Sequence, residues 1–445
     1  MSLYWCELAW LGGDTATADV LVDVEGARIS AVSTGVPCPP DAVRLHGLTL
    51  PGMANAHSHA FHRALRGRTH AGSGSFWTWR EQMYSVASRL TPDSYFQLAR
   101  AVYGEMVLAG ITSVGEFHYL HHAPGGVRYS DPNAMGAALV AAAAEAGVRL
   151  TLLDTCYLHG GIGIAPNEVQ LRFSDGSAGA WAERLAGFDR SATDVLLGAA
   201  VHSVRAVDPD SMATVVQWAR THEVPLHAHV SEQPAENLQC LDAYGRTPTA
   251  VLADAGALSA GFTAVHATHL TDADISAYGR HHCTICMCPT TERDLADGIG
   301  PARRLAEAGA TLSLGSDSHA VIDLFEEARA VELNERLASN LRGNHSMAAL
   351  LAAATRDGHA SLGRPDAGAL EVGQWADLVS VRMDSVRTAG AGAGSALGAA
   401  VFAASAADVH HVVAGGRVVV ADGRHVALDV AGELSRSIAA VLEDA

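Results

Sequence analysis

The first feature of this sequence that could do chemistry is a pair of histidines, His57 and His59, at the end of an apolar run. In a β-strand, side chains two residues apart point to the same side and lie about 6.6 Å apart along the chain. Two such imidazoles can converge on one metal ion, with metal–nitrogen bonds of about 2.1 Å. The chain holds 23 histidines, so the pair carries weight only together with further ligands.

Three more polar clusters follow apolar runs later in the chain. They are HAHVSE at 227–232, HATH at 266–269 and GSDSH at 315–319. If these runs are strands of one barrel, their imidazoles and the Asp317 carboxylate meet in a single pocket. Three histidines and one aspartate around a divalent ion leave a position for water, which is the arrangement of a hydrolytic metal centre. These ligand types suit Zn²⁺, with Fe²⁺ or Mn²⁺ as substitutes.

The elements that would hold these clusters are eight short apolar runs between about residues 51 and 364. The runs are 52–59, 112–118, 150–157, 195–201, 225–230, 263–267, 283–288 and 310–314. Helical patterns separate most of them; within 208–222, apolar residues recur at the helical period after the cap pair Asp208-Pro209. Eight strands alternating with helices predict a (β/α)8 barrel at 51–364, whose chemistry lies at the C-terminal strand ends.

Both ends of the chain are rich in β patterns, including a plausible hairpin turn at Gly415-Gly416. We expect residues 1–50 and 365–430 to form one small β-sandwich-like domain, followed by a C-terminal helix at 431–445. The Gly- and Ala-rich stretch 388–400 is predicted to be a flexible loop of that domain.

Composition limits the classes of partner. The 445 residues include 30 basic and 48 acidic ones, for a net charge of −18, and every basic residue is arginine. An acidic surface repels nucleic-acid phosphates and anionic lipids, so we expect neither as a partner. The absence of lysine excludes a Schiff-base lysine and a carboxylated lysine that bridges two metals. Seven cysteines, no positively charged leader and no bilayer-length apolar run predict a cytoplasmic protein with reduced thiols.

Longer strings carry a family resemblance. PGMANAHSHAFHRALRG at 51–67, with HAHVSE, VHATHL and LGSDSH in that order, resembles the amidohydrolase superfamily, and within it the mononuclear aminohydrolases. More narrowly, four strings are similar to the formimidoylglutamate deiminases of histidine degradation: FWTWRE (76–81), EFHYLHH (116–122), VHSVRAV (201–207) and CPTTERDLADG (288–298). The resemblance spans nearly the whole chain. It implies hydrolysis of N-formimino-L-glutamate to N-formyl-L-glutamate and ammonia with one Zn²⁺ per chain, and a homodimer.

The resemblance also implies roles for individual residues. The metal ligands would be His57, His59, His229 and Asp317. Glu232 would shuttle protons and His266 would polarise the bond under attack, so that both act with Asp317 as catalytic groups. Three residues after the histidine pair the family usually has glutamine, whereas this chain has His62, which puts one substrate contact in doubt.

Hydrolysis of an amidine-type carbon requires a base that takes a proton from water and an acid that returns one to the leaving nitrogen. Glu232 follows His229 by three residues, where the strand gives way to a loop, and it is placed for both tasks. His227, His269 and His319 each neighbour a predicted functional residue. We expect these three histidines to hold the neighbouring side chains in place or to pack in the core.

A dicarboxylate substrate would need fixed positive groups, because the net charge works against anions at long range. The arginine guanidinium matches a carboxylate in two parallel hydrogen bonds. The predicted substrate-binding residues are Arg80, Tyr119, His202, Arg205 and His62. Two other functions stay open at this stage: a related aminohydrolase acting on a purine, pterin or triazine ring, and a catalytically silent barrel that binds a metal or metabolite. The aromatic residues at 76–79 are either core or a lid over the pocket.

Overall fold

Eight parallel strands form the central sheet, in chain order, each paired with the next. The computed structural model describes residues 2–70, 74, 76–189 and 194–442. The strands are β5 (Met53–Ser58), β6 (Ile111–His118), β7 (Arg149–Cys156), β8 (Val195–Val201), β9 (Leu226–Val230), β10 (Phe262–His266), β11 (Thr284–Met287) and β12 (Thr311–Leu314). Each overlaps the run predicted for it, and the barrel is confirmed.

The barrel is closed by residues just beyond the last strand. The Asp317 N–H donates to the His57 carbonyl at 3.0 Å, and the His59 N–H donates to the Asp317 carbonyl at 3.3 Å. These bonds join β5 to the segment after β12, far apart in the sequence. Three of the four predicted metal ligands, His57, His59 and Asp317, therefore form the seam between the first and last strands.

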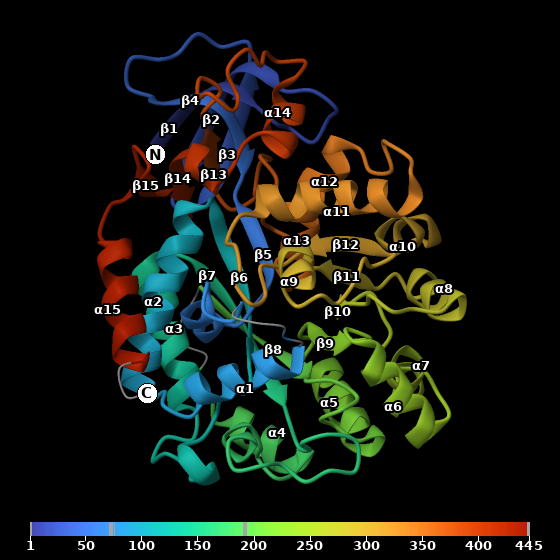
Figure 1. Ribbon diagram of the computed structural model, residues 1–445. Coiled ribbons are helices and arrows are strands. Elements are labelled where there is room, and N and C mark those ends of the chain that lie inside the picture. Colours follow the sequence, from blue (N-terminus) through green and yellow to red (C-terminus); the bar gives the residue numbers. More distant parts are fainter. Residues whose placement is uncertain (1, 71–73, 75, 190–193, 443–445) are drawn as a thin grey trace.

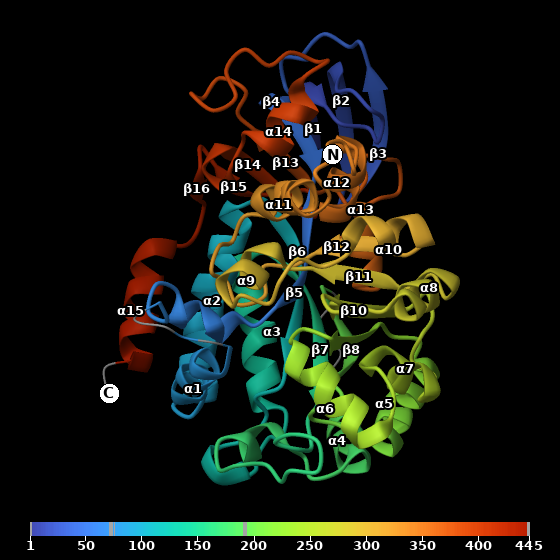
Figure 2. The ribbon, with the colours of Figure 1, turned by 45° about the vertical axis from the view of Figure 1, so that its right-hand side comes forward.

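Helices surround the strands and connect them (Figure 2). They are α1 (Phe76–Ala87), α2 (Pro92–Leu108), α3 (Ala134–Ala146), α4 (Ala178–Ala186), α5 (Pro209–Thr221), α6 (Pro234–Tyr244), α7 (Pro248–Asp254), α8 (Asp272–Arg280), α9 (Pro289–Asp294), α10 (Ala302–Ala308), α11 (Leu324–Ser339), α12 (Met347–Ala354) and α13 (Arg356–Ser361). As predicted, α5 begins beside Asp208, whose carboxylate accepts the Ser211 N–H at 3.0 Å. Short 3₁₀ helices also occur, among them η1 (Ala60–Leu65) and η3 (Gln170–Phe173).

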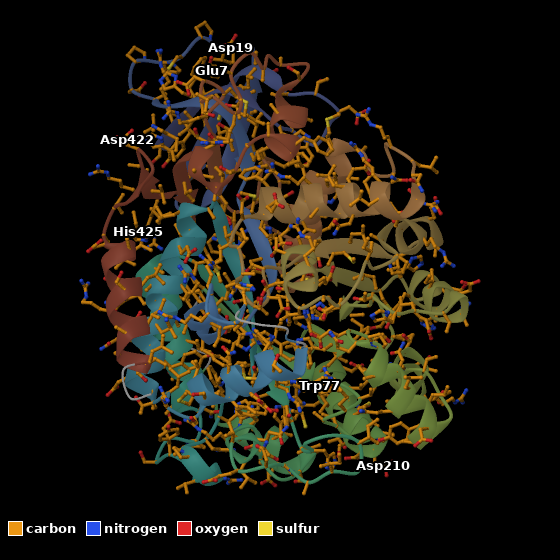
Figure 3. All side chains as sticks on the ribbon, viewed as in Figure 1. Glu7, Asp19, Trp77, Asp210, Asp422 and His425 are labelled. Atoms are coloured by element: carbon orange, nitrogen blue, oxygen red, sulfur yellow. The ribbon has the colours of Figure 1, made fainter. Side chains whose placement is uncertain are left out.

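Strands from both termini form the second sheet, at one end of the molecule (Figure 1). In spatial order they are β16 (Arg424–His425), β15 (Arg417–Ala421), β14 (Val409–Ala414), β13 (Leu378–Val381), β4 (Val43–Pro51), β1 (Ser2–Ala9), β2 (Thr17–Glu25) and β3 (Arg28–Thr34). The sheet has its own apolar core, and the Tyr4 hydroxyl donates across it to the Gly416 carbonyl at 3.2 Å. Figure 3 shows Glu7 and Asp19 at this end, well away from Trp77 on α1.

The prediction of a loop over 388–400 is wrong at its end, because helix α14 (Ala396–Phe402) begins there. Ala396, Leu397, Ala400 and Val401 are buried on one side of this helix, and burial of an apolar face stabilises a short helix. The C-terminal helix is α15 (Val430–Leu442), which lies along α2 (Figure 1); residues 443–445 of the predicted helix lie outside the described residues. None of the described helices is both long and apolar enough to cross a bilayer.

Candidate metal centre and substrate pocket

Four side chains predicted to bind a metal meet at the C-terminal end of the barrel. His57 and His59 come from the end of β5, His229 from β9, and Asp317 from the loop after β12. The His229 Nε2 atom lies 3.1 Å from His57 Nε2 and 3.4 Å from His59 Nε2. Asp317 Oδ1 lies 3.3 Å and 3.4 Å from the same two atoms. All four side chains are buried.

Backbone carbonyls orient two of these imidazoles. His59 Nδ1 lies 2.9 Å from the Phe117 carbonyl, and His229 Nδ1 lies 3.0 Å from the His202 carbonyl. A carbonyl oxygen only accepts, so each Nδ1 carries the hydrogen and each Nε2 presents a lone pair. Lone pairs that face one another beside a carboxylate repel unless a cation lies between them. The donor set therefore fits one divalent ion.

Burial keeps these histidines neutral. It lowers the pKa of His57 and His229, and lowers that of His59 to about 3, an effect to which the neighbouring His57 adds. Burial alone would raise the pKa of Asp317, but the hydrogen bond to His57 and the positive charge of His266 hold it below its usual range. Neutral imidazoles and an ionised carboxylate are the forms that bind metals.

The backbone is strained where the strands deliver functional residues. Ser231, His266 and Asp317 have φ values of 52°, 68° and 44°. These values lie in the left-handed region, where a residue other than glycine costs roughly 1–3 kcal/mol of conformational free energy. These three residues follow or end β9, β10 and β12. Such strain is concentrated at functional sites, where it aims side chains that a regular strand could not.

Glu232 and His266, the predicted proton shuttle and polarising group, lie next to each other beside the four ligands. His266 Nε2 is 3.8 Å from Glu232 Oε1 and 3.6 Å from Asp317 Oδ2. Burial disfavours a charge on His266, but the hydrogen bond to Glu292 and the carboxylates of Glu232 and Asp317 raise its pKa well above the ordinary value. A protonated His266 can donate a hydrogen bond to a reacting group.

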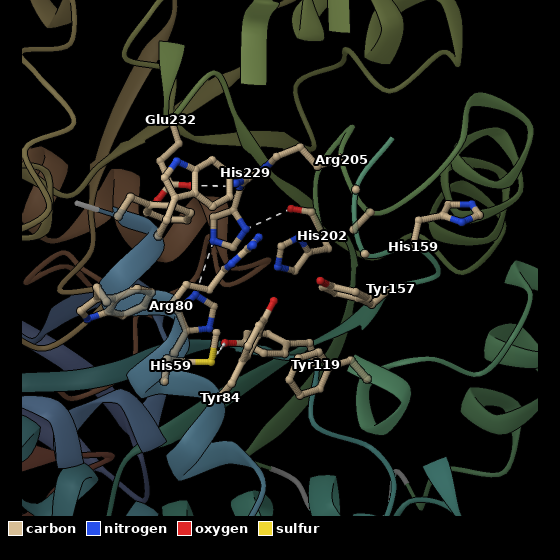
Figure 4. A pocket seen from close by; sticks show the side chains of 18 of the residues that line it. His59, Arg80, Tyr84, Tyr119, Tyr157, His159, His202, Arg205, His229 and Glu232 are labelled. Carbon is tan, nitrogen blue, oxygen red and sulfur yellow. Dashed lines mark hydrogen bonds and ion pairs between the residues drawn. The ribbon is translucent and has the colours of Figure 1, made fainter. Parts of the chain in front are cut away.

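A cavity of about 240 Å³ opens onto this centre (Figure 4). All five predicted substrate-binding residues line it: His62, Arg80, Tyr119, His202 and Arg205. His62 Nε2 lies 2.9 Å from the Tyr119 hydroxyl. The roles of these residues stay predictions, but the structure brings all of them to one pocket, which His59, His229 and Asp317 also line.

The two arginines differ in their partners. Arg205 Nη2 donates to Glu232 Oε2 at 3.1 Å, and Arg205 Nε lies 3.3 Å from Glu236 Oε2. The Arg80 guanidinium lies over the Trp77 ring at 4.5 Å, and within the described part of the chain it makes no ion pair with a carboxylate. Arg205 is thus tied to the Glu232 and Glu236 carboxylates, whereas the charge of Arg80 is available to a ligand.

Several pocket residues escaped the sequence analysis, namely Tyr84, Tyr157, His159 and Gln239. Tyr157 directly follows β7, so the rule that strand ends face the pocket would have found it. Tyr84 lies within helix α1 and not at a strand end, so the same rule would not have identified it. Phe76, Trp77 and Trp79 line the cavity, while Phe76 and Trp79 also belong to the apolar core.

Three histidines beside the predicted functional residues make hydrogen bonds outside the metal centre. His227 Nε2 lies 2.9 Å from the Ser361 carbonyl, and His269 Nε2 lies 2.7 Å from the Asp297 carbonyl. His319 contacts Ser58 Oγ at 3.2 Å. None of these three lines the cavity, in keeping with the supporting roles expected for them.

Comparisons with known proteins show similarity to amidohydrolases along almost the whole chain. The model of the amidohydrolase family matches residues 48–419. A formimidoylglutamate deiminase of Pseudomonas aeruginosa is 39% identical over 397 residues, which cover 86% of this chain and 87% of that protein. An 8-oxoguanine deaminase of the same species is 30% identical over 418 residues, 91% and 89% of the two chains. A crystal structure of an amidohydrolase from Brucella melitensis is 34% identical, has a TM-score of 0.90, and covers 99% of this chain and 100% of its own.

Proposed function

The chain belongs to the amidohydrolase family, and from this premise we propose that it hydrolyses N-formimino-L-glutamate to N-formyl-L-glutamate and ammonia. One observation carries the proposal. The cavity is lined both by His59, His229 and Asp317 of the metal centre and by Arg80, whose guanidinium has no carboxylate partner among the described residues. A ligand that reaches both needs a hydrolysable carbon–nitrogen group and a carboxylate. The relative of 39% identity carries the name of this activity.

In the proposed reaction, water adds to the carbon of the formimino group and the bond to the terminal nitrogen breaks. The water oxygen becomes the formyl oxygen, and the nitrogen leaves as ammonia. A divalent ion held by His57, His59, His229 and Asp317 would lower the pKa of a water molecule beside this carbon toward about 7. Glu232 takes the proton from water and returns it to the leaving nitrogen.

Two neighbours assist Glu232 in this scheme. The hydrogen bond from Arg205, 3.1 Å long, fixes the orientation of the carboxylate between the two proton transfers. His266, held between Glu292, Glu232 and Asp317, donates a hydrogen bond to the terminal nitrogen of the formimino group and so makes the carbon, which water attacks, more electrophilic. Arg80 binds a carboxylate of the glutamate moiety.

A purine deaminase is the second candidate, because Phe76, Trp77 and Trp79 give the cavity flat aromatic walls on which a base could stack, and the relative of 30% identity is named as an 8-oxoguanine deaminase. A neutral purine in the cavity would cover the Arg80 guanidinium without giving it a counter-ion, which disfavours its binding.

A substrate panel separates the two candidates. The protein should be assayed for ammonia release from N-formimino-L-glutamate, guanine, 8-oxoguanine and adenosine at equal concentrations. We expect the largest kcat/KM for N-formimino-L-glutamate. A larger kcat/KM for any purine would overturn the proposed substrate and leave the metal centre unaffected.

Replacement of Arg80 by alanine is expected to raise KM for N-formimino-L-glutamate roughly tenfold to a hundredfold. A charge-assisted hydrogen bond contributes about 1.5–3 kcal/mol, and this one is lost while the metal ligands stay in place. Steady-state kinetics and elemental analysis measure the two quantities. Arg246→Ala, which removes only the exposed pair with Asp254, is the matched control. An Arg80→Ala enzyme with wild-type KM would show that Arg80 does not bind the substrate.

A further inference from the structure

Two tyrosines of the pocket share one buried amide. Gln170, the first residue of η3, is 3% exposed, and its Nε2 donates to the Tyr157 hydroxyl at 2.7 Å and to the Tyr84 hydroxyl at 2.9 Å. Tyr84 and Tyr157 line the cavity, and Figure 4 shows their hydroxyl ends turned toward the same part of it. The amide therefore lies behind the two hydroxyls, on the side away from the pocket.

The orientation of the Gln170 amide is fixed by the backbone. The Asn167 N–H donates to Gln170 Oε1 at 2.9 Å, and the Gln170 N–H donates to Asn167 Oδ1 at 2.9 Å. A backbone N–H can only donate, so the atom that faces it must be the amide oxygen and the other must be the NH₂ group. A Cβ at Gly160 would lie 2.7 Å from Gln170 Oε1, so glycine there leaves room for the amide.

This arrangement decides which way the tyrosine hydrogens point. Each hydroxyl oxygen already accepts a hydrogen from Gln170, and Tyr157 also shares a hydrogen bond with Tyr84, so one hydroxyl hydrogen of the pair is left for an acceptor in the cavity. Within the described residues, no carboxylate bonds to either hydroxyl. The Arg80 guanidinium lies 5.6 Å from the Tyr84 ring centre and adds a positive charge to the same region. A hydroxyl donor beside a guanidinium matches the two oxygens of a carboxylate, one for each group.

The region lies some distance from the metal centre. The His202 ring separates it from the ligands, with its centre 4.5 Å from that of Tyr157 and 5.1 Å from that of His229. A carboxylate bound there belongs to the far end of a substrate whose reacting carbon lies at the ligands. In formiminoglutamate, that end is the γ-carboxylate.

We propose that Tyr84 and Tyr157, polarised by Gln170 as a positioning residue, form the receptor for the γ-carboxylate of the substrate. The inference rests on the proposed function and deepens it, because it assigns one of the two carboxylates to named donors. Gln170 touches no substrate; it acts by donating to both hydroxyl oxygens, so that the hydrogen not shared between the two tyrosines is directed toward the cavity.

The test replaces the Gln170 amide, which donates hydrogen bonds to the two tyrosine hydroxyls, by a carboxylate, which can only accept them. In Gln170→Glu, the carboxylate still accepts the Asn167 N–H, but it also accepts from both tyrosines, whose hydrogens then turn away from the cavity. We expect KM for N-formimino-L-glutamate to rise roughly thirtyfold or more, since several charge-assisted bonds are lost, while kcat changes by less than about threefold. Gln170→Met, which removes the amide without offering an acceptor, should raise KM far less.

A second measurement is the ratio of the inhibition constants of N-formyl-L-glutamate and N-formyl-L-glutamine as competitive inhibitors. A pocket that is merely distorted would not change this ratio. The two compounds differ only in the γ-group, which is a charged carboxylate in one and a neutral carboxamide in the other. The wild type should prefer the glutamate compound, and Gln170→Glu should lose that preference, whereas a damaged pocket would weaken both inhibitors alike. The Tyr84→Phe, Tyr157→Phe double variant should lose it too, and it serves as the test if Gln170→Glu does not fold.

The outcomes are distinct. A wild type that turns over N-formimino-L-glutamate and prefers the glutamate inhibitor, with the preference unchanged in Gln170→Glu or in the double tyrosine variant, overturns the inference alone. A wild type that neither turns over this substrate nor discriminates between the inhibitors overturns the proposed function and the inference with it.

Discussion

Glu232→Gln is expected to keep its metal and lose at least two orders of magnitude in kcat. The amide has the shape of the carboxylate, but it can neither take a proton from water nor return one to the leaving nitrogen. General acid–base steps contribute about 10²–10⁴-fold to enzymatic rates. Because the Glu232 side chain is not among the four ligands, the metal content should stay at the wild-type value. Steady-state kinetics with elemental analysis on the same sample measures both.

The control for this variant is Glu183→Gln, the same chemical change at an exposed position on α4, which should leave kcat unchanged. KM in Glu232→Gln should move little, since Arg205 can still donate to the amide oxygen. A metal-replete Glu232→Gln enzyme with near-normal turnover would mean that another group moves the protons.

The second large effect is expected from the ligands. Purified protein should contain about one transition-metal ion per chain, because three imidazoles and one carboxylate supply a single set of ligands. His229→Ala and Asp317→Ala should each lose most of the metal and, with it, nearly all of the activity. Elemental analysis after dialysis gives the stoichiometry directly.

His222→Ala is the matched control for the ligand variants, since His222 stacks on Trp218 at the end of α5, away from the cavity. It should keep a full metal complement. Two metal equivalents per wild-type chain, or unchanged metal in both ligand variants, would contradict the assignment of these four residues.

The barrel could be predicted from the sequence because parallel strands buried on both faces appear as continuous apolar runs. Each run also ended in polar residues, which identified the end of the strand that faces the pocket. The four ligands, Glu232 and the five substrate-binding candidates followed from this rule together with the family resemblance, and in the structure all of them except the buried His57 line one cavity.

Pairing between distant side chains could not be predicted in the same way. Arg205 was expected to read a substrate carboxylate, but whether its guanidinium is available depends on Glu232 and Glu236, which approach it from another strand end. Gln170 lies in the long connection between β7 and α4, where no periodic pattern indicates the direction of a side chain. Helix α14 depends on burial of its apolar face, which a Gly- and Ala-rich string does not reveal.

The seam between β5 and β12 couples metal binding to the stability of the whole barrel. Its backbone hydrogen bonds run between Asp317 and the histidine pair. The same residues supply three of the four ligands, so an ion bound there would link the first strand to the segment after the last. The complete ligand set exists only after the barrel has closed, so the ion binds the folded chain in preference to the unfolded one. At a free concentration a thousand times its dissociation constant, it would add about 4 kcal/mol to the free energy of unfolding. Chelation should therefore lower the melting temperature and, in hydrogen exchange, release the His59 and Asp317 amides before those in the middle of the sheet.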